Sequence, residues 1–194
     1  MLRKNIITCL SLAIISMSVA CNGGDDKAKE KDSKEVAEDV NEQKFTKDSS
    51  ESNAQLLVDV AAANYHEIEM ATIAKEKSKD NDIRTLSDML IADHNKVLAE
   101  VKDMASKKSV TLPVAESDDS KKASQEFRDK KAADFNKDWV KAMTDAHEKS
   151  ISKFESIVND SKADGEMKTW AGNTLPALRA HLDKLTQLKA KFKE

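Results

Sequence analysis

Three histidines and one glutamate of this chain each fall on the apolar face of a predicted helix. When the segments are wound at about 100° per residue, Glu67, His94, His147 and His181 lie within about 40° of the middle of the apolar arc. An imidazole or a carboxylate is costly to bury unless it is paired, so each of these side chains needs a polar partner in the core. Imidazole nitrogens and carboxylate oxygens are also the ligands that proteins offer to transition metals.

Each of these side chains belongs to a different predicted helix. Helical periodicity covers residues 53–79, 82–108, a long segment that follows Pro113 and ends near residue 160, and 166–192. The long segment shows a break near residue 130. Pro176 lies inside the last helix, where it removes one backbone hydrogen bond and predicts a kink.

The positions along the helices place the four side chains at similar depths. Glu67 and His94 lie about 13 and 14 residues from the turn between their helices, and His147 and His181 about 16 and 18 residues from theirs. At about 1.5 Å per residue, each pair is level to within a few ångströms. The height of one pair relative to the other is less certain, because the middle connection has no clean boundaries. That all four groups converge is therefore a prediction.

Two interpretations of these inward polar groups stay open. In the first, Glu67 accepts hydrogen bonds from the histidines, and the resulting polar layer fixes how the helices pack. In the second, the groups bind one transition-metal ion such as zinc, iron or copper, with Asn64 and Asp93 as outer partners. Calcium and magnesium do not suit, because they prefer oxygen ligands. A Cu(I) site or a haem that uses Met143 is a further alternative, although methionine at helical spacing is more often core filler.

The composition is typical of an all-α protein. Of the 194 residues, 39% are apolar and 35% charged, while glycine and proline, which punctuate turn-rich β folds, number four and two. The predicted helices, joined by two short turns and one longer middle connection, indicate an antiparallel four-helix bundle. The net charge of −3 and the lack of a basic stripe with interleaved aromatics argue against nucleic-acid binding.

The first twenty residues have the pattern of a secretory signal. Arg3 and Lys4 precede the apolar stretch IITCLSLAII, which is too short to cross a bilayer as a helix. The sequence S-V-A-C that ends at Cys21 resembles a bacterial lipobox, which implies cleavage before Cys21 and its acylation. We therefore expect residues 1–20 to be removed and Cys21 to anchor the protein in the membrane; an ordinary secretory signal is the alternative. With Cys9 removed, no disulfide framework is expected.

A polar segment precedes the predicted helices. Residues 22–52 carry dense mixed charge and few apolar side chains, so we expect a disordered leash with transient helix around KEVAEDV. The capping-box pattern of Ser52 and Gln55 places the helical domain at 53–194. The pair Asp25–Asp26 looks like a signal for surface display, so we expect the anchored domain to face either the periplasm or the cell surface.

Four segments of this domain resemble domain of unknown function 4142, a family of bacterial envelope proteins. They are YHEIEMATIAKEKS, MLIADHNKVLAEVKDMASKKSVTLP, VKAMTDAHEKSISKFESIV and TLPALRAHLDKL, in the family's order over about residues 53–191. The resemblance implies a ferritin-like bundle and an outer-membrane or periplasmic location, but no reaction. The positions that match the family's pattern are Glu67, His94, His147, His181 and Leu175–Pro176. Ala146 departs from it, because many relatives place Asp there, and this weakens any site that needs two Asp-His pairs.

The sequence argues against a ferritin-type di-iron site. Such a site needs Glu three residues before His on two helices, together with two further carboxylates. The residues three before the histidines are Ala63, Ile91, Thr144 and Leu178. H-E-x-x-H and a glycine-rich phosphate loop are also missing, and His66 is expected to be solvated surface. We therefore expect a binding protein, with a structural or stress-related bundle as second hypothesis and a ferritin-like redox enzyme as third.

Overall fold

The computed structural model of the protein describes residues 30–46 and 48–192. Within these ranges the chain is all-helical, as the composition predicted, and contains no strand. The predicted signal peptide at 1–20 and the predicted lipidation site at Cys21 lie outside the described residues. No helix in the described ranges is both long and apolar enough to cross a membrane. The six helices are α1 (Ser33–Lys44), α2 (Asp48–Lys77), α3 (Asn81–Lys107), α4 (Asp118–Asp129), α5 (Ala132–Asn159) and α6 (Gly165–Lys191).

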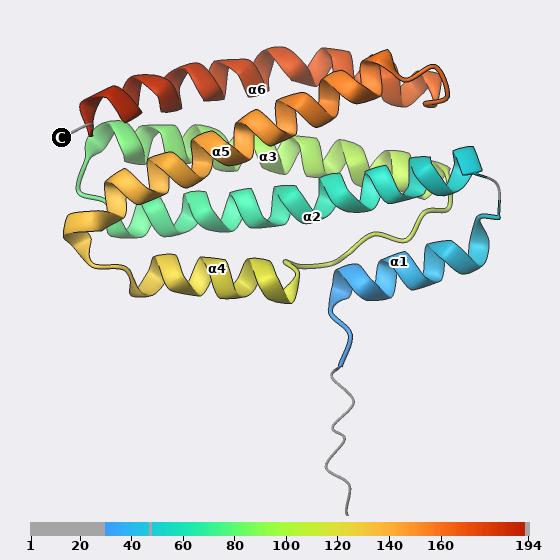
Figure 1. Ribbon diagram of the computed structural model, residues 1–194, viewed down its shortest axis with the longest axis horizontal. Helices are drawn as coiled ribbons and strands as arrows, with labels where there is room; N and C mark the ends of the chain where they lie inside the picture. Colours follow the sequence, from blue (N-terminus) through green and yellow to red (C-terminus); the bar gives the residue numbers. More distant parts are fainter. Residues whose placement is uncertain (1–29, 47, 193–194) are drawn as a thin grey trace, which may run out of the picture. The chain divides into compact units, whose positions relative to one another are not determined.

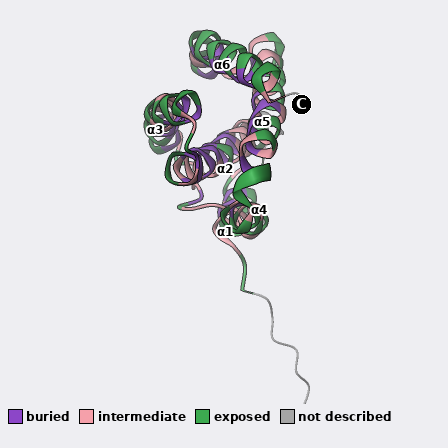
Figure 2. Ribbon diagram, turned by 90° about the vertical axis from the view of Figure 1, so that its left-hand side faces the viewer, coloured by how far each residue is buried: buried purple, intermediate pink, exposed green. Residues whose placement is uncertain are grey.

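The four long helices, α2, α3, α5 and α6, surround a common core (Figure 1). α2 packs against α3 and α5 packs against α6, and the two pairs meet through contacts of α2 with α5 and of α3 with α6. Figure 2 shows the buried sides of these helices turned toward one another. The short helices α1 and α4 both pack against α2, outside this core.

Capping side chains determine where several helices begin. The carboxylate of Asp80 accepts hydrogen bonds from backbone N–H groups in the first turn of α3, and that of Asp164 does the same for α6. Both helices lie within one residue of their predicted limits. The start of α2 differs from the prediction, because this helix begins at Asp48. Ser52 therefore lies inside α2, and the predicted capping box is not formed.

The long segment after Pro113 consists of two helices. α4 ends at Asp129 and α5 begins at Ala132, so the break expected near residue 130 is present. The chain turns back at this break, and α4 lies along α2 while α5 contributes to the core (Figure 1). Pro176 lies within α6, which continues past it.

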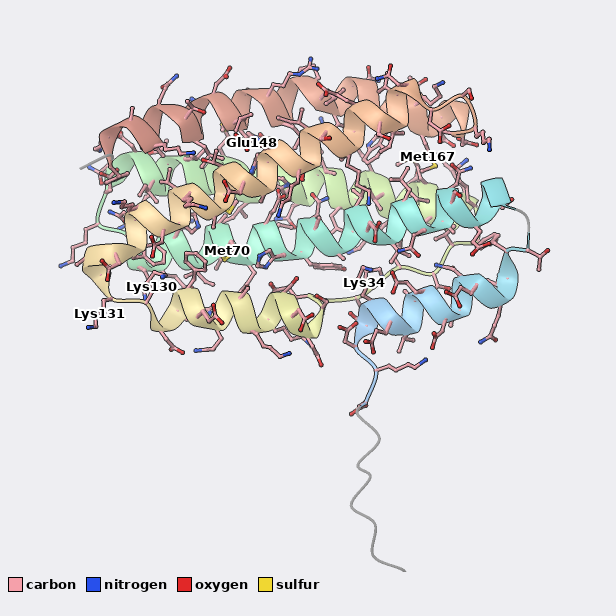
Figure 3. All side chains as sticks on the ribbon, viewed as in Figure 1. Lys34, Met70, Lys130, Lys131, Glu148 and Met167 are labelled. Carbon is pink, nitrogen blue, oxygen red and sulfur yellow. The ribbon has the colours of Figure 1, made fainter. Side chains whose placement is uncertain are left out.

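The buried apolar side chains form two clusters at different depths along the long helices. Figure 3 labels a methionine from each, Met167 in the first cluster and Met70 in the second. α2 and α6 pass from the first cluster to the second, whereas α3 and α5 pass from the second to the first. In each long helix, the inward polar residue predicted from the sequence lies between the two clusters. The core is therefore divided by a polar layer.

α1 occupies part of the segment 22–52, for which the composition indicated a disordered leash. Ala37 of this helix is buried, and Asn41 is bound at both ends of its side-chain amide. Asn41 Nδ2 donates to the carbonyl oxygen of Thr111 at 2.8 Å, and Asn41 Oδ1 accepts from the N–H of Thr111 at 2.8 Å. The structure differs from the expected leash over this stretch, because contacts with a distant part of the chain stabilise a helix, around the expected KEVAEDV, whose own composition is polar.

One carboxylate joins the starts of α1 and α4. Asp32 accepts hydrogen bonds from the N–H groups of Lys34 and Glu35 in α1, and from the N–H of Asp118 in α4. These bonds lower the pKa of Asp32. Because both helix N-termini carry partial positive charge, a single negative group between them stabilises both helices.

We predict that Asn41→Ala loosens the attachment of α1 to the connection between α3 and α4 and leaves the core intact. The substitution removes both hydrogen bonds to Thr111 and leaves two backbone groups without this partner, at a cost of about 2 kcal/mol. Amide hydrogen exchange across 33–44 should then accelerate by about tenfold or more. Glu42→Ala, at an exposed position of the same helix, is the control and should change nothing. Equal exchange in both variants would contradict the docking of α1.

Candidate metal centre

The four side chains predicted from the sequence meet between the two apolar clusters. Glu67 comes from α2, His94 from α3, His147 from α5 and His181 from α6. Each of these residues is at most 4% exposed. The three imidazole rings form a triangle whose centroids are 5.3 to 5.4 Å apart. The convergence that was predicted from helix lengths is therefore present.

His94 is oriented by Asn64, one of the two outer partners named from the sequence. Asn64 Nδ2 donates to the carbonyl oxygen of Val60 at 2.8 Å, so its Oδ1 faces the ring of His94. His94 Nδ1 lies 3.0 Å from this oxygen and must donate to it, because an amide oxygen only accepts. The neutral ring then carries its lone pair on Nε2, which faces the centre.

His147 and His181 are held in the same manner. His147 Nδ1 donates to the carbonyl oxygen of Met143 at 2.9 Å, and His181 Nε2 donates to Asp93 Oδ2 at 2.8 Å. The other nitrogens, His147 Nε2 and His181 Nδ1, lie 3.3 Å apart. Each histidine thus has one nitrogen bound to an oxygen acceptor and the other directed inward. Ligating histidines in metal sites usually have this pattern of outer partners.

The inward atoms of the four residues are close enough to share one ion. One ring nitrogen from each histidine lies within 4.8 Å of those of the other two. Glu67 Oε2 lies 2.9 Å from His94 Nε2 and 3.9 Å from His147 Nε2. Four tetrahedral ligands at about 2.1 Å from a zinc ion lie about 3.4 Å from one another. The separations of 2.9 and 3.9 Å from Glu67 and of 3.3 Å between His147 and His181 lie on either side of this value.

Glu67 Oε2 and His94 Nε2 are buried without a hydrogen bond to any other described atom. They lie 2.9 Å from each other, a distance at which a protonated His94 would form an ion pair with Glu67 and a neutral ring would leave both atoms without a hydrogen bond. The other carboxylate oxygen, Oε1, accepts from the hydroxyl of Ser150 at 3.1 Å. Buried polar atoms are rarely left without a partner. Two such atoms side by side among the three imidazole rings are suited to bind a cation.

The electrostatics of the cluster favour a charged Glu67 and neutral rings at His147 and His181. Burial alone would raise the pKa of Glu67, but the imidazoles of His94 and His147 and the hydroxyl of Ser150 together lower it to about 2. Burial lowers the pKa of His147 to about 4, against the opposing effect of Glu67. Burial also lowers the pKa of His181, despite its contact with Asp93. Metal ligation requires these same protonation states, a carboxylate and neutral imidazoles.

We predict that the metal-free protein loses stability when the pH falls from 7 to 5. The unfolded chain protonates His147 near its ordinary pKa of 6.5, whereas the folded chain does so only near 4, so acid favours unfolding in this window. The expected loss for this residue is about 2 kcal/mol. Urea unfolding of chelator-treated protein measures it, and His147→Gln should show a smaller loss. Identical losses in both proteins would contradict the buried neutral imidazole.

Two features of the centre were not found from the sequence. Ser150, which binds Glu67, is one of many serines, and its spacing from the histidines carries no signal. Met143 contributes its backbone carbonyl oxygen to His147, while its side chain packs in the second apolar cluster. Met143 therefore contacts His147 through its main chain, and its side chain fills space in the core.

His66 is not the solvated surface residue that the sequence indicated. Its Nδ1 lies 2.8 Å from Glu116 Oε1, and the hydroxyl of Ser124 donates to the same carboxylate oxygen at 2.8 Å. Ser124 is buried, and the Ser124 hydroxyl and Glu116 approach the same ring nitrogen of His66. This arrangement ties α2 to α4 and differs from a catalytic triad, in which the serine and the acid contact opposite nitrogens of the histidine.

Comparison with protein families matches residues 38–188 to a family described as a domain of unknown function, DUF4142. The matched region begins within α1 and ends within α6, so it contains all four side chains of the candidate centre. No curated protein and no solved structure matches the chain in the corresponding comparisons.

Proposed function

The chain belongs to the DUF4142 family, and because that description names no activity, we propose from the geometry of the site that the protein binds one transition-metal ion. The ligands in this proposal are His94, His147, His181 and Glu67. The ion lies in the polar layer between the two apolar clusters, where it links all four long helices. The protein is a binding protein in this account, and no reaction is assigned to it.

The proposal rests on one observation: the inward nitrogens of the three histidines and the carboxylate of Glu67 are hydrogen-bond acceptors that face one another. The proton-bearing nitrogen of each histidine donates a hydrogen bond to an outer partner, which is Asn64, Met143 or Asp93. The inward nitrogens then present lone pairs, and Glu67 adds a charged carboxylate among them. Such an arrangement is repulsive by itself, whereas a cation at the centre makes every contact favourable.

The chemistry of the ligands narrows the choice of ion. Three imidazole nitrogens and one carboxylate oxygen suit zinc, iron or copper. Calcium and magnesium require shells of oxygen atoms, which this buried cluster does not offer. A di-iron centre needs more carboxylates than the single one supplied here by Glu67. The proposal is therefore a mononuclear site.

A ligand-free polar layer is the second candidate, and two contacts favour it. His147 Nε2 and His181 Nδ1 are 3.3 Å apart, a distance at which a second proton on either ring would form a hydrogen bond, and Ser150 donates to one oxygen of Glu67. In this account the four groups only fix the packing of the helices. It leaves Glu67 Oε2 and His94 Nε2 without hydrogen bonds, which is the physical reason for ranking it second.

We also propose the finer architecture and the cellular address. The opposite directions of neighbouring helices through the two clusters support an antiparallel four-helix bundle of ferritin-like type. The lipobox-like sequence supports anchoring at Cys21 in the bacterial outer membrane, with the domain facing the periplasm or the cell surface. Because α1 begins at Ser33, fewer residues separate the first helix from Cys21 than the predicted leash of residues 22–52 contains.

Equilibrium dialysis tests the proposed function directly. The purified protein is stripped with a chelator, dialysed separately against zinc, iron(II) and copper salts, and analysed for bound metal by mass spectrometry. We expect close to one ion per chain with at least one of these metals. If the chain retains none of them, the ligand-free polar layer is correct and the metal proposal is wrong.

Asn64→Ala is predicted to lower the affinity for the metal by about 10- to 100-fold. The substitution removes the oxygen that orients His94 and selects its tautomer. Asn95→Ala is the control, because Asn95 also binds the carbonyl oxygen four residues before it but lies exposed on α3. Competition with a chromophoric chelator measures both affinities. Equal affinities would show that Asn64 does not act on the centre.

A further inference from the structure

A small cavity of about 30 Å³ adjoins the candidate metal centre. Glu67 and His94, two of the four proposed ligands, form part of its wall. Ser150 lies beside Glu67, and apolar side chains, among them Val97, Phe154 and Leu178, form the rest of the inner wall. A molecule in this cavity would contact these two residues, each of which has a side-chain atom without a hydrogen bond.

We propose that this cavity is the binding site for a small uncharged molecule of two heavy atoms, such as a diatomic gas or a peroxide, that binds to the metal. The inference rests on the proposed function, since the ion supplies the bond. The protein's own residues supply the size limit, the polarity and the route of entry.

The size of the cavity sets the first restriction. By the same measure of volume, about 10 to 15 Å³ is enough to hold one water molecule. The present cavity has about twice that space, which is enough for two bonded heavy atoms. Its inner wall is formed by buried side chains such as Phe154 and Leu178, so a larger ligand would have to displace them or extend toward solvent.

The charges around the cavity set the second restriction. A divalent ion is balanced by the carboxylates of Glu67 and Asp93, the latter through its hydrogen bond to His181. At the cavity wall, Lys153 forms an ion pair with Asp59, and Lys34, which also contacts Asp59, pairs with Glu38. The charges at the proposed ion and the charges beside the cavity therefore each sum to about zero before any ligand enters. An added anion would leave a net negative charge in a buried site, which is unfavourable, so a neutral molecule is preferred.

The walls also fit this class of molecule. The methyl groups of Val97 and Leu178 and the ring of Phe154 give an apolar surface that does not compete with the metal for the ligand. Ser150 is the nearby polar group that can exchange hydrogen bonds with the second atom of the ligand, because its hydroxyl already lies at Glu67. Ala63 is exposed and also lines the cavity, so the opening to solvent lies on this side of α2.

Nitric oxide and the iron(II)-loaded protein provide the test. Bound iron is measured first, and nitric oxide is then added without oxygen and followed by electron paramagnetic resonance. We expect the half-integer-spin signal of an iron–nitrosyl complex from most of the bound iron. Azide, an anion of three heavy atoms, should bind more weakly than nitric oxide. Tighter binding of azide would overturn the assignment to a neutral ligand.

Two valine variants connect the signal to the cavity. Val97→Ile adds one methyl group to the wall and should weaken nitric oxide binding by about tenfold or more, with unchanged iron content. Val158→Ile is the matched control, because Val158 is a half-buried residue beside the same apolar cluster and does not line the cavity. Equal binding by Val97→Ile and wild type would overturn the inference.

The outcomes separate this inference from the function on which it rests. A protein that binds iron but forms no nitrosyl complex has a closed metal site; the inference is then wrong and the proposed metal binding stands. A protein that binds no iron(II) fails at the first measurement, and both the iron site and the ligand cavity are then wrong. A nitrosyl signal that Val97→Ile weakens supports both.

Discussion

His147→Ala is expected to lower the affinity for the metal by at least about a hundredfold, more than the loss of an outer partner. His147 is fully buried and central, since its Nε2 lies 3.3 Å from His181 Nδ1 and 3.9 Å from Glu67 Oε2. Its removal leaves at most three ligands and a cavity that a methyl group does not fill. Metal analysis after dialysis against a limiting concentration of the ion measures the loss.

Two further variants separate loss of a ligand from loss of the fold. His147→Gln keeps most of the volume of the side chain, so its circular dichroism should match that of the wild type while its metal content falls. His66→Ala removes a histidine that lies on the same helix as Glu67 but contacts Glu116 instead. This control should bind metal normally. If His147→Gln retained the wild-type affinity, His147 would not be a ligand.

The second large effect is stabilisation of the fold by the metal. An ion that binds only the folded chain raises the free energy of unfolding by about 2.7 kcal/mol when its free concentration is 100 times its dissociation constant. For a domain of this size, that corresponds to an increase of about 5 to 10 °C in the unfolding temperature. Differential scanning calorimetry of stripped and reloaded protein measures the shift.

The ligand-free polar layer predicts a different outcome of this experiment. It predicts no change in unfolding temperature on addition of metal, and a lower temperature for Glu67→Ala with or without metal. In the metal account, His147→Ala needs at least about a hundredfold more free metal than the wild type for the same increase in unfolding temperature. An equal increase in both proteins would show that the ion binds elsewhere.

The inward direction of the four site residues was predictable because it depends on local geometry. A helix repeats every 3.6 residues, so the apolar positions around His94 determine which way its ring points. The depth of each residue follows from the rise per residue and from the short turns at 78–80 and 160–164. The two apolar clusters lie on either side of the predicted layer in each long helix.

The position of α1 was not predictable in the same way. Its stability depends on hydrogen bonds between residues far apart in the chain, such as Asn41 with Thr111 and Asp32 with Asp118. A polar segment shows no sign of such contacts in its own composition. The ion pairs and capping hydrogen bonds of α1 and α4 join segments far apart in the chain, so they become visible only in the three-dimensional structure.

The outer partners of the centre were predictable from the sequence only in part. Asn64 and Asp93 were named from the sequence because they precede Glu67 and His94 by three residues and one residue, which leaves them near the edge of the apolar arc. Ser150 was not, because it lies three residues after His147 among many similar serines. Which nitrogen of each histidine points inward depends on ring rotation, and a helical pattern does not determine that rotation.

X-ray absorption spectroscopy at the edge of the bound metal tests the central claim most directly, because it identifies the atoms that surround the ion. For the proposed site of three histidines and one glutamate, we expect a shell of nitrogen and oxygen atoms at about 2.0 to 2.2 Å from the metal, with the outer-shell scattering of three imidazole rings. In His147→Ala this imidazole scattering should decrease or the metal should be lost. A shell that contains sulfur, or a shell of oxygen atoms alone, would contradict a centre built from three histidines and one glutamate.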